Sequence, residues 1–309
     1  MSRTVNSERL FTESDCEILR DLIWKVADFC GVKVVTYAIL SNHFHVLVRV
    51  PKKAFVPDEE VVRRYASLYP TPSQRRPEYL PVIEQHVREQ SPQAEAWLVK
   101  QRNQMGDLSE YMKLLKQRFT GIFNVLHDRH GTLWSERFKS VLVEDGRALH
   151  TMAVYIDLNP VRAGLVSDPK DYRFCGYAEA VAGSKLAQQG LCTVTEEHTW
   201  EEAASSYRQS LFGRAGKPSR KGERISAEVV DRVFKENGKL PHHVVLTCRI
   251  RYFTNGAVLG SRNFVAQELA KLKKKYGRVR ALEPMMLPPI TDWGPIMLLR
   301  RCRAGICPA

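Results

Sequence analysis

Two histidines stand two positions apart in an apolar segment, at His43 and His45. Residues 43–50 are rich in β-branched and apolar side chains and are followed by Pro51, which predicts a strand that ends at residue 50. Side chains at positions i and i+2 of a strand share one face, so the two imidazoles should project side by side. Neutral imidazoles bind divalent cations. Alone, the pair leaves two interpretations open: half of a metal site, or a structural pair on a sheet surface.

A second group of polar side chains lies in the segment 155–160, within a stretch whose apolar spacing predicts a helix over 148–159. Tyr155 and Asn159 are four residues apart and therefore share one helical face. An amide oxygen at Asn159 can complete a metal site, and Tyr155 can present a phenol to whatever the cation polarises. Taken alone, this segment favours the simpler interpretation of a core tyrosine and an asparagine that ends a helix before Pro160.

Several predicted elements position these groups. An amphipathic helix over 15–31, ending near Gly31, leads into a strand over 32–40, a turn at 41–42 and the strand of the histidine pair. Residues 108–127 predict a second amphipathic helix, and residues 133–144 a strand or hairpin arm. Prolines interrupt residues 52–106, which predicts a helical excursion away from the sheet.

The two groups are accompanied, in this order and spacing, by further motifs: Tyr37–Val48, Phe119, Asn124, Gly131–Trp134, Arg137–Ser140 and Tyr155–Gly164. With these motifs the chain resembles the single-tyrosine HUH transposases, specifically the REP-associated tyrosine transposase branch, over about residues 1–180. The resemblance implies an α+β fold: a ferredoxin-like antiparallel sheet with helices on one face, forming the HUH catalytic domain. It also implies Mg2+ or Mn2+ held by His43, His45 and Asn159, with Tyr155 as the nucleophile.

The chain departs from that family in two places. The first strand is shortened, which leaves two interpretations open: an exposed sheet edge, or a start assigned at the wrong residue. The excursion at 52–106 is longer than in compact members of the family. The resemblance therefore does not predict how the region between the strand and the helix contacts DNA.

The basic charge is unevenly distributed along the chain. Of the net charge of +13, residues 1–207 contribute −1, from 26 Lys and Arg against 27 Asp and Glu. Residues 208–309 contribute +14, from 21 against 7. This asymmetry favours a polyanionic partner for the last third, with nucleic acid as the first choice and a solubilising tail as the alternative.

The expected organisation is a catalytic domain over 1–183 with its insertion at 52–106, a linker over 184–224, a smaller all-α basic domain over 225–281 and a tail over 282–309. Helix-capping residues predict three helices in the basic domain, ending near Gly238, Gly256 and Gly277, with Ser261 capping the last. A helix-turn-helix fits this pattern, as does a packing bundle with a solvated basic face.

Cations near the motifs and in the basic domain are expected to bind DNA: Arg137, Lys139, Arg162, Arg262, Lys273, Lys274 and Lys275. Trp134 and Phe138 interleave with two of these cations. That mixture suits stacked bases and held phosphates of single-stranded DNA, although both aromatic side chains also fit a core.

The expected activity is cleavage and rejoining of single-stranded or hairpin DNA of repetitive elements, through metal-assisted transesterification and a phosphotyrosine intermediate. The alternative is a domesticated protein that binds DNA hairpins without cutting them.

Seven cysteines without a C-x-x-C pair indicate neither a disulfide framework nor a zinc ribbon. Residues 1–6 lack the apolar core of a signal peptide, and no stretch is long and apolar enough for a bilayer span. We therefore expect a cytoplasmic, nucleoid-associated protein, monomeric or homodimeric, with no membrane partner.

Overall fold

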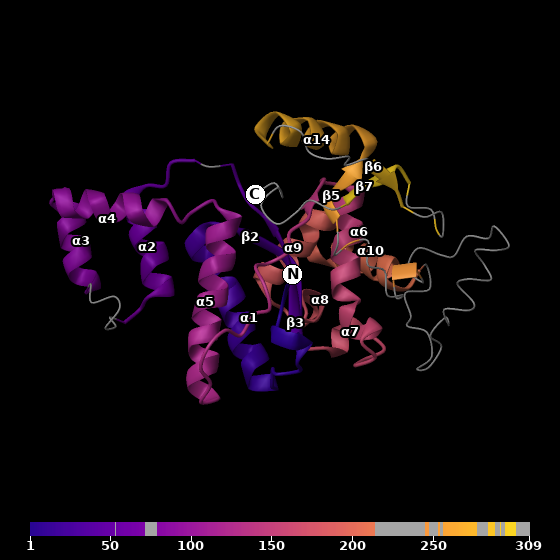
Figure 1. Ribbon diagram of the computed structural model, residues 1–309, viewed down its shortest axis with the longest axis horizontal. Coiled ribbons are helices and arrows are strands. Elements are labelled where there is room, and N and C mark those ends of the chain that lie inside the picture. Colours follow the sequence, from indigo (N-terminus) through magenta and orange to yellow (C-terminus); the bar gives the residue numbers. More distant parts are fainter. Residues whose placement is uncertain are drawn as a thin grey trace. The chain divides into compact units, whose positions relative to one another are not determined.

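The computed structural model describes most of the chain (Figure 1), namely residues 1–52, 54–71, 79–213, 245–246, 253, 256–276, 284–287, 291 and 294–300. The fold is mixed α+β, as the sequence predicts, and the described residues form two sheets. The chain divides into two compact units. Unit 1 comprises Met1–Leu10, Val35–Leu47 and Trp134–Pro308; unit 2 comprises Phe11–Val34 and Val48–Leu133.

The first sheet is antiparallel and has the strand order β1-β3-β2. Its strands are β1 (Ser2–Arg3), β2 (Lys33–Leu40) and β3 (His43–Arg49). The tight turn at 41–42 joins the two long strands, as their apolar runs predict. Strand β1 is only two residues long and is followed by a 3-10 turn, η1 (Val5–Ser7).

Chain segments lie along both edges of this sheet. Beside β1, Trp134 forms an antiparallel bridge with Thr4, and the Lys139 N–H donates to the Met1 carbonyl at 2.9 Å. Beside β2, Cys175 bridges Ala38 in the same antiparallel sense. The order is therefore 134–139, β1, β3, β2, and the edge that a short first strand would leave open is covered. The expected strand over 133–144 is reduced to the bridge at Trp134 and to β4 (Leu142–Val143).

Within the described residues of unit 1, further helices follow the first sheet along the chain. They are α6 (Arg147–Asp157), α7 (Asn159–Arg162), η2 (Pro169–Asp171), α8 (Gly176–Val181), α9 (Lys185–Thr195) and α10 (Trp200–Phe212). The last two occupy much of the expected linker. Each has a side-chain cap, from Ser184 and Thr199, and α9 packs against α8, α10 and α6. Helix formation here follows from the caps and from buried apolar faces.

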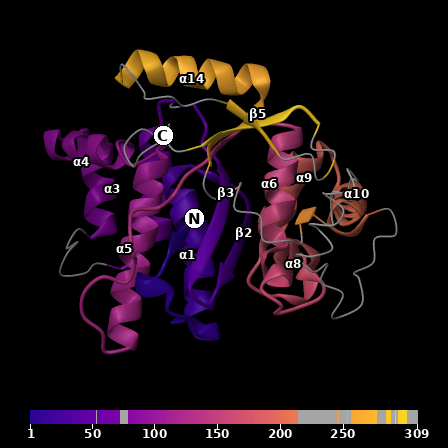
Figure 2. The same cartoon turned by 45° about the vertical axis from the view of Figure 1, so that its right-hand side comes forward.

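A second sheet has the order β4-β5-β7-β6 and lies against a helix (Figure 2). Its further strands are β5 (Gly256–Ser261), β6 (Pro284–Met286) and β7 (Ile296–Arg300); the helix is α14 (Arg262–Tyr276). Strand β4 is parallel to β5, and the other pairs are antiparallel. Val265, Leu269 and Leu272 of α14 bury their side chains against β5 and β7, including Val258 and Leu299.

The C-terminal part therefore differs from the expected all-α domain. Residues 256–261, placed at the end of one predicted helix and the start of the next, form a strand. The apolar side chains of β5 are buried, and the strand lies between β4 and β7 in the sheet. Because both neighbouring strands are distant in sequence, the local spacing of apolar residues does not predict this pairing. The helix after Ser261 is confirmed, and the Phe264 N–H donates to the Ser261 hydroxyl at 3.2 Å. The two preceding predicted helices lie mostly outside the described residues.

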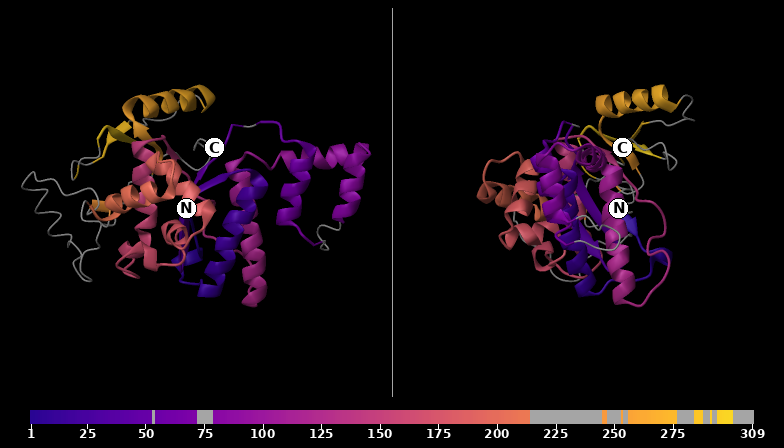
Figure 3. Two further views of the ribbon diagram at one scale, coloured as in Figure 1. Left: turned by 180° about the vertical axis from the view of Figure 1, so that it is seen from behind. Right: turned by 90° about the vertical axis from the view of Figure 1, so that its left-hand side faces the viewer.

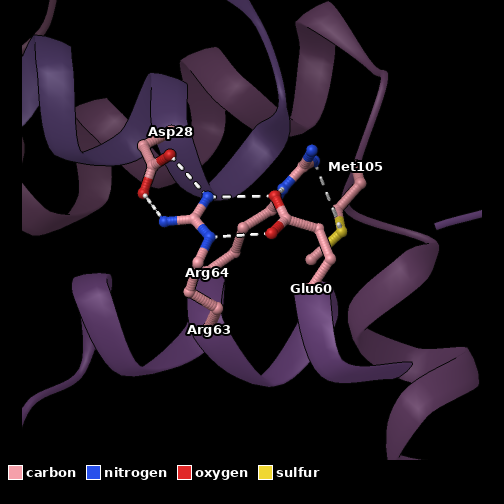
Figure 4. Close-up of polar contacts among 5 residues, drawn as sticks. All are labelled: Asp28, Glu60, Arg63, Arg64 and Met105. Atoms are coloured by element: carbon pink, nitrogen blue, oxygen red, sulfur yellow. Dashed lines mark hydrogen bonds and ion pairs between the residues drawn. The ribbon is translucent and has the colours of Figure 1, made fainter. Parts of the chain in front are cut away.

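Unit 2 is helical. It contains α1 (Glu13–Cys30), α2 (Asp58–Leu68), α3 (Leu80–Arg88), α4 (Pro92–Arg102) and α5 (Leu108–Leu126). Helix α1 packs against α2 and α5, and α2 to α4, which lie within residues 52–106, pack on one another (Figure 3). Arg63 joins α1 to α2, because its guanidinium contacts Asp28 at 2.9 Å and Glu60 at 2.7 Å (Figure 4). No helix in the described part of the chain is long and apolar enough to cross a membrane.

Candidate metal and tyrosine site

The histidine pair lies on one face of β3, as its spacing predicts. His43 is half-buried and His45 is 7% exposed, and their ring centroids are 5.3 Å apart. Phe44, between them, is fully buried on the opposite face, where its ring packs against Trp134 at 5.5 Å. The Nδ1 atom of His43 is 2.6 Å from the Asn42 side-chain oxygen. The strand therefore presents two adjacent imidazoles, one of them oriented by a neighbouring amide.

Both imidazoles are held in the neutral form. Burial, followed by the positive charge of Arg3, lowers the pKa of His43 from 6.5 to about 4. Burial, followed by the amino group of Met1, lowers the pKa of His45 well below its usual value. A neutral imidazole has a free lone pair, which is the form that coordinates a cation. At neutral pH the pair therefore has the protonation state that metal coordination requires.

Tyr155 on α6 is brought to this pair. Its ring centroid lies 6.3 Å from that of His45, at an interplanar angle of 86°. The Arg162 guanidinium lies over the tyrosine ring at 3.9 Å, and the Phe253 ring packs on it at 4.8 Å. Arg162 also donates to the backbone carbonyls of Tyr155, at 2.7 Å, and of Leu246, at 2.8 Å. These contacts fix the tyrosine beside the histidine pair and leave it 6% exposed.

Asn159 is the first residue of α7 and is 7% exposed. Its side-chain nitrogen is buried without a hydrogen-bond partner in the described part of the chain. Leaving a buried N–H donor unpaired costs free energy. Among the described residues, no group of three His, Cys, Asp or Glu could hold a metal ion. The amide oxygen of Asn159 stays the predicted third ligand beside the two histidines.

The other predicted DNA-binding cations lie on different elements. Arg137 and Lys139 are exposed in the segment beside β1, where the Lys139 ammonium pairs with Glu136 at 2.9 Å. Trp134, in the same segment, belongs to the core, whereas Phe138 is only half-buried. The remaining cations are exposed on α14: Arg262, Lys273, Lys274 and Lys275. Arg162 differs from all of these because its guanidinium is engaged with backbone carbonyls and the Tyr155 ring.

The sequence reading missed a buried carboxyl group in the same helix. Asp157 is fully buried at the end of α6, where it accepts hydrogen bonds from the Thr36 hydroxyl at 2.7 Å and the Tyr207 hydroxyl at 2.6 Å. It also accepts one from the Tyr177 N–H at 3.2 Å. It thereby ties the end of α6 to β2, α8 and α10. A Cβ at Gly176 would overlap the Thr36 side chain, so this close approach requires glycine. The sequence feature that could have indicated this role is an acidic residue two positions after Tyr155 in an otherwise apolar helix.

We expect Asp157→Ala to destabilise the protein by on the order of 3 kcal/mol, because three buried donors lose their acceptor. Burial raises the pKa of the Asp157 carboxyl from 3.8 to about 7. Between these values the folded chain keeps a proton that the unfolded chain has released, so this contribution to stability falls as pH rises through the window and levels off above it. Asp157→Asn should remove that slope in urea unfolding measured at pH 5 and pH 7.5.

The matched control for this experiment is Asp171→Asn, which neutralises an exposed carboxyl in η2 and should keep the wild-type slope. A slope in Asp157→Asn equal to that of the wild type would contradict the assigned role of the buried carboxyl.

Comparison of the chain with protein-family models, curated proteins and solved structures finds no match. The site itself has two neutral imidazoles with a tyrosine fixed beside them, and a buried amide lies at the start of α7.

Proposed function

We propose that the protein is a metal-dependent single-strand DNA endonuclease and strand transferase, a tyrosine transposase acting on single-stranded or hairpin DNA of repetitive elements. The observation that carries this proposal is the Tyr155 ring placed 6.3 Å from His45, which itself adjoins His43. The strand order 134–139, β1, β3, β2 supports a ferredoxin-like sheet for the catalytic domain, because the chain visits those strands in the sequence β1, β2, β3, then 134–139.

The residues present fit a divalent cation. Two neutral imidazoles and an amide oxygen, at His43, His45 and Asn159, would hold it and leave positions open for phosphate and water. Imidazole ligands alone would favour zinc, whereas the amide oxygen and the open positions favour Mg2+ or Mn2+. When bound, the cation supplies stabilisation of the negative charge that develops on a phosphodiester under attack.

The chain's own residues perform the proposed exchange. The Tyr155 oxygen forms a bond to phosphorus, the bond from phosphorus to one sugar oxygen breaks, and the phenolic proton ends on that departing sugar hydroxyl. The phosphotyrosine conserves the bond energy, so a second sugar hydroxyl can reverse the exchange and rejoin strands. Arg162 orients the nucleophile in two ways: its guanidinium lies over the face of the Tyr155 ring, and it donates a hydrogen bond to the Tyr155 backbone carbonyl.

A covalent adduct separates this proposal from its rivals. The full chain is mixed with Mn2+ and a labelled hairpin oligonucleotide carrying a single-stranded flank, then resolved under denaturing conditions. We expect a shortened oligonucleotide together with label bound to protein. A protein that only binds DNA hairpins gives neither product, and a hydrolytic nuclease gives shortened DNA without label on the protein.

The exposed lysines of α14 are expected to supply non-specific affinity. Replacing Lys273, Lys274 and Lys275 by glutamine should reduce the slope of log affinity against log salt by up to about 2, at roughly 0.7 per phosphate on single strands. Cleavage at saturating DNA should persist. Substitution is preferred to deletion of residues 208–309, because α10 and β5 pack within the catalytic unit.

The matched control carries the same loss of charge at three exposed lysines of unit 2, Lys25, Lys52 and Lys100. An equal change of slope in the two triple variants would show that the α14 lysines have no special role in DNA binding.

A further inference from the structure

Arg3 lies directly opposite His43 in the antiparallel pairing of β1 with β3. Directly opposed residues of antiparallel strands project from the same face, with Cβ atoms roughly 5 Å apart. Burial follows this alternation, since Ser2 and Thr4 are buried whereas Arg3 is exposed. Ser2 is paired with Phe44, which is buried on the face away from the histidines. The guanidinium therefore stands on the same face as the histidine pair.

Arg3 places a positive charge beside this pair, because it is exposed on the same face as His43. In the described part of the chain, no carboxylate forms an ion pair with Arg3. A fixed cation next to residues suited to hold a second cation is unfavourable unless an anion lies between the two.

We propose that Arg3 forms a phosphate subsite of the candidate metal site, in which its guanidinium holds non-bridging oxygens of a DNA phosphodiester beside the His43–His45 pair. Guanidinium groups donate two parallel hydrogen bonds to phosphate, which fixes orientation as well as position. The phosphodiester provides the missing anion between the two positive groups. This assignment rests on the proposed function, and it adds a substrate-binding residue from β1, an element outside the motifs of β3, α6 and α7.

The test measures binding rather than cleavage. In a Tyr155→Phe background, which prevents turnover, the full chain is titrated with Mn2+ and a fluorescein-labelled hairpin oligonucleotide, and anisotropy reports affinity. Arg3→Gln should weaken binding about tenfold, the size expected for a charged hydrogen bond, and should lower the salt slope by roughly 0.7. Arg9→Gln removes the same charge from an exposed residue after β1 and should change affinity less than twofold.

Manganese affinity, followed by electron paramagnetic resonance without DNA, separates a binding role from a structural one. Removing a positive charge beside the ligands should leave Mn2+ affinity unchanged or increase it, whereas loss of the β1 pairing would weaken both Mn2+ and DNA binding. Arg3→Lys should recover part of the DNA affinity relative to Arg3→Gln, because lysine restores the positive charge but not the two parallel hydrogen bonds of the guanidinium. A neutral methylphosphonate at the phosphate contacted by Arg3 should abolish the difference between wild type and Arg3→Gln.

The outcomes are distinguishable. If the wild-type protein cleaves the hairpin and the Tyr155→Phe protein binds it, but Arg3→Gln and Arg9→Gln have equal effects on affinity, the Arg3 subsite is wrong while the proposed function stands. If Arg3→Gln loses Mn2+ and DNA affinity together, Arg3 is structural and the subsite is again wrong. If neither the wild-type protein nor Tyr155→Phe binds hairpin DNA at low salt, the proposed function and the subsite are both wrong.

Discussion

Replacing Tyr155 by phenylalanine is expected to abolish the covalent DNA adduct, reducing cleavage by at least about 10³-fold, while DNA affinity changes less than twofold. Only the hydroxyl is removed. The phenyl ring keeps the packing of Phe253 and the Arg162 guanidinium on its face, so the site should retain its shape. The measurement combines denaturing electrophoresis for the adduct with anisotropy for affinity.

Tyr79→Phe is the control for this variant, because it removes an exposed phenol in unit 2 and should leave cleavage unchanged. Persistent adduct formation in Tyr155→Phe would mean that another residue is the nucleophile. Persistent cleavage without an adduct would favour attack by water, with Tyr155 as a structural residue.

The second large effect concerns the histidine pair. His43→Ala should weaken both Mn2+ affinity and cleavage by roughly 100-fold, because one of the few proposed protein ligands is lost. The pKa of His43 is held at about 4, so protons compete for this nitrogen only well below neutrality. Mn2+ affinity of the wild type should therefore be nearly constant between pH 6 and pH 8 and fall as pH approaches 4.

His86→Ala, at an exposed position of α3, is the matched control and should change neither property. Full cleavage by the wild type in EDTA would contradict the metal assignment, and so would an unchanged Mn2+ affinity in His43→Ala.

The parts of the site that depend on local pattern could be predicted from the sequence. Alternation placed His43 and His45 on one face of a strand, and helical spacing put Tyr155 on the helix that the structure shows. A period of two in a strand and of 3.6 in a helix is a property of a few consecutive residues, which explains this success. That the strand and the helix would lie side by side came only from the family resemblance.

The rest depends on contacts between residues distant in sequence. Arg3 meets His43 through strand register, and Asp157 meets Tyr207 through the packing of α6 against α10. Strand β5 pairs with β4, more than a hundred residues earlier in the chain, so its apolar residues gave no sign of whether they would form helix or strand. Such register and packing follow from the whole fold and not from a local period.

Mass spectrometry of the trapped adduct tests the central claim most directly. After reaction with Mn2+ and a hairpin oligonucleotide, the protein is digested with nuclease and trypsin. Cleavage after Arg147 and Arg162 releases residues 148–162, in which Tyr155 is the only tyrosine. The account predicts a nucleotide phosphate on Tyr155 in this peptide and in no other. An adduct on a different residue, or cleaved DNA with no adduct on any peptide, would contradict it.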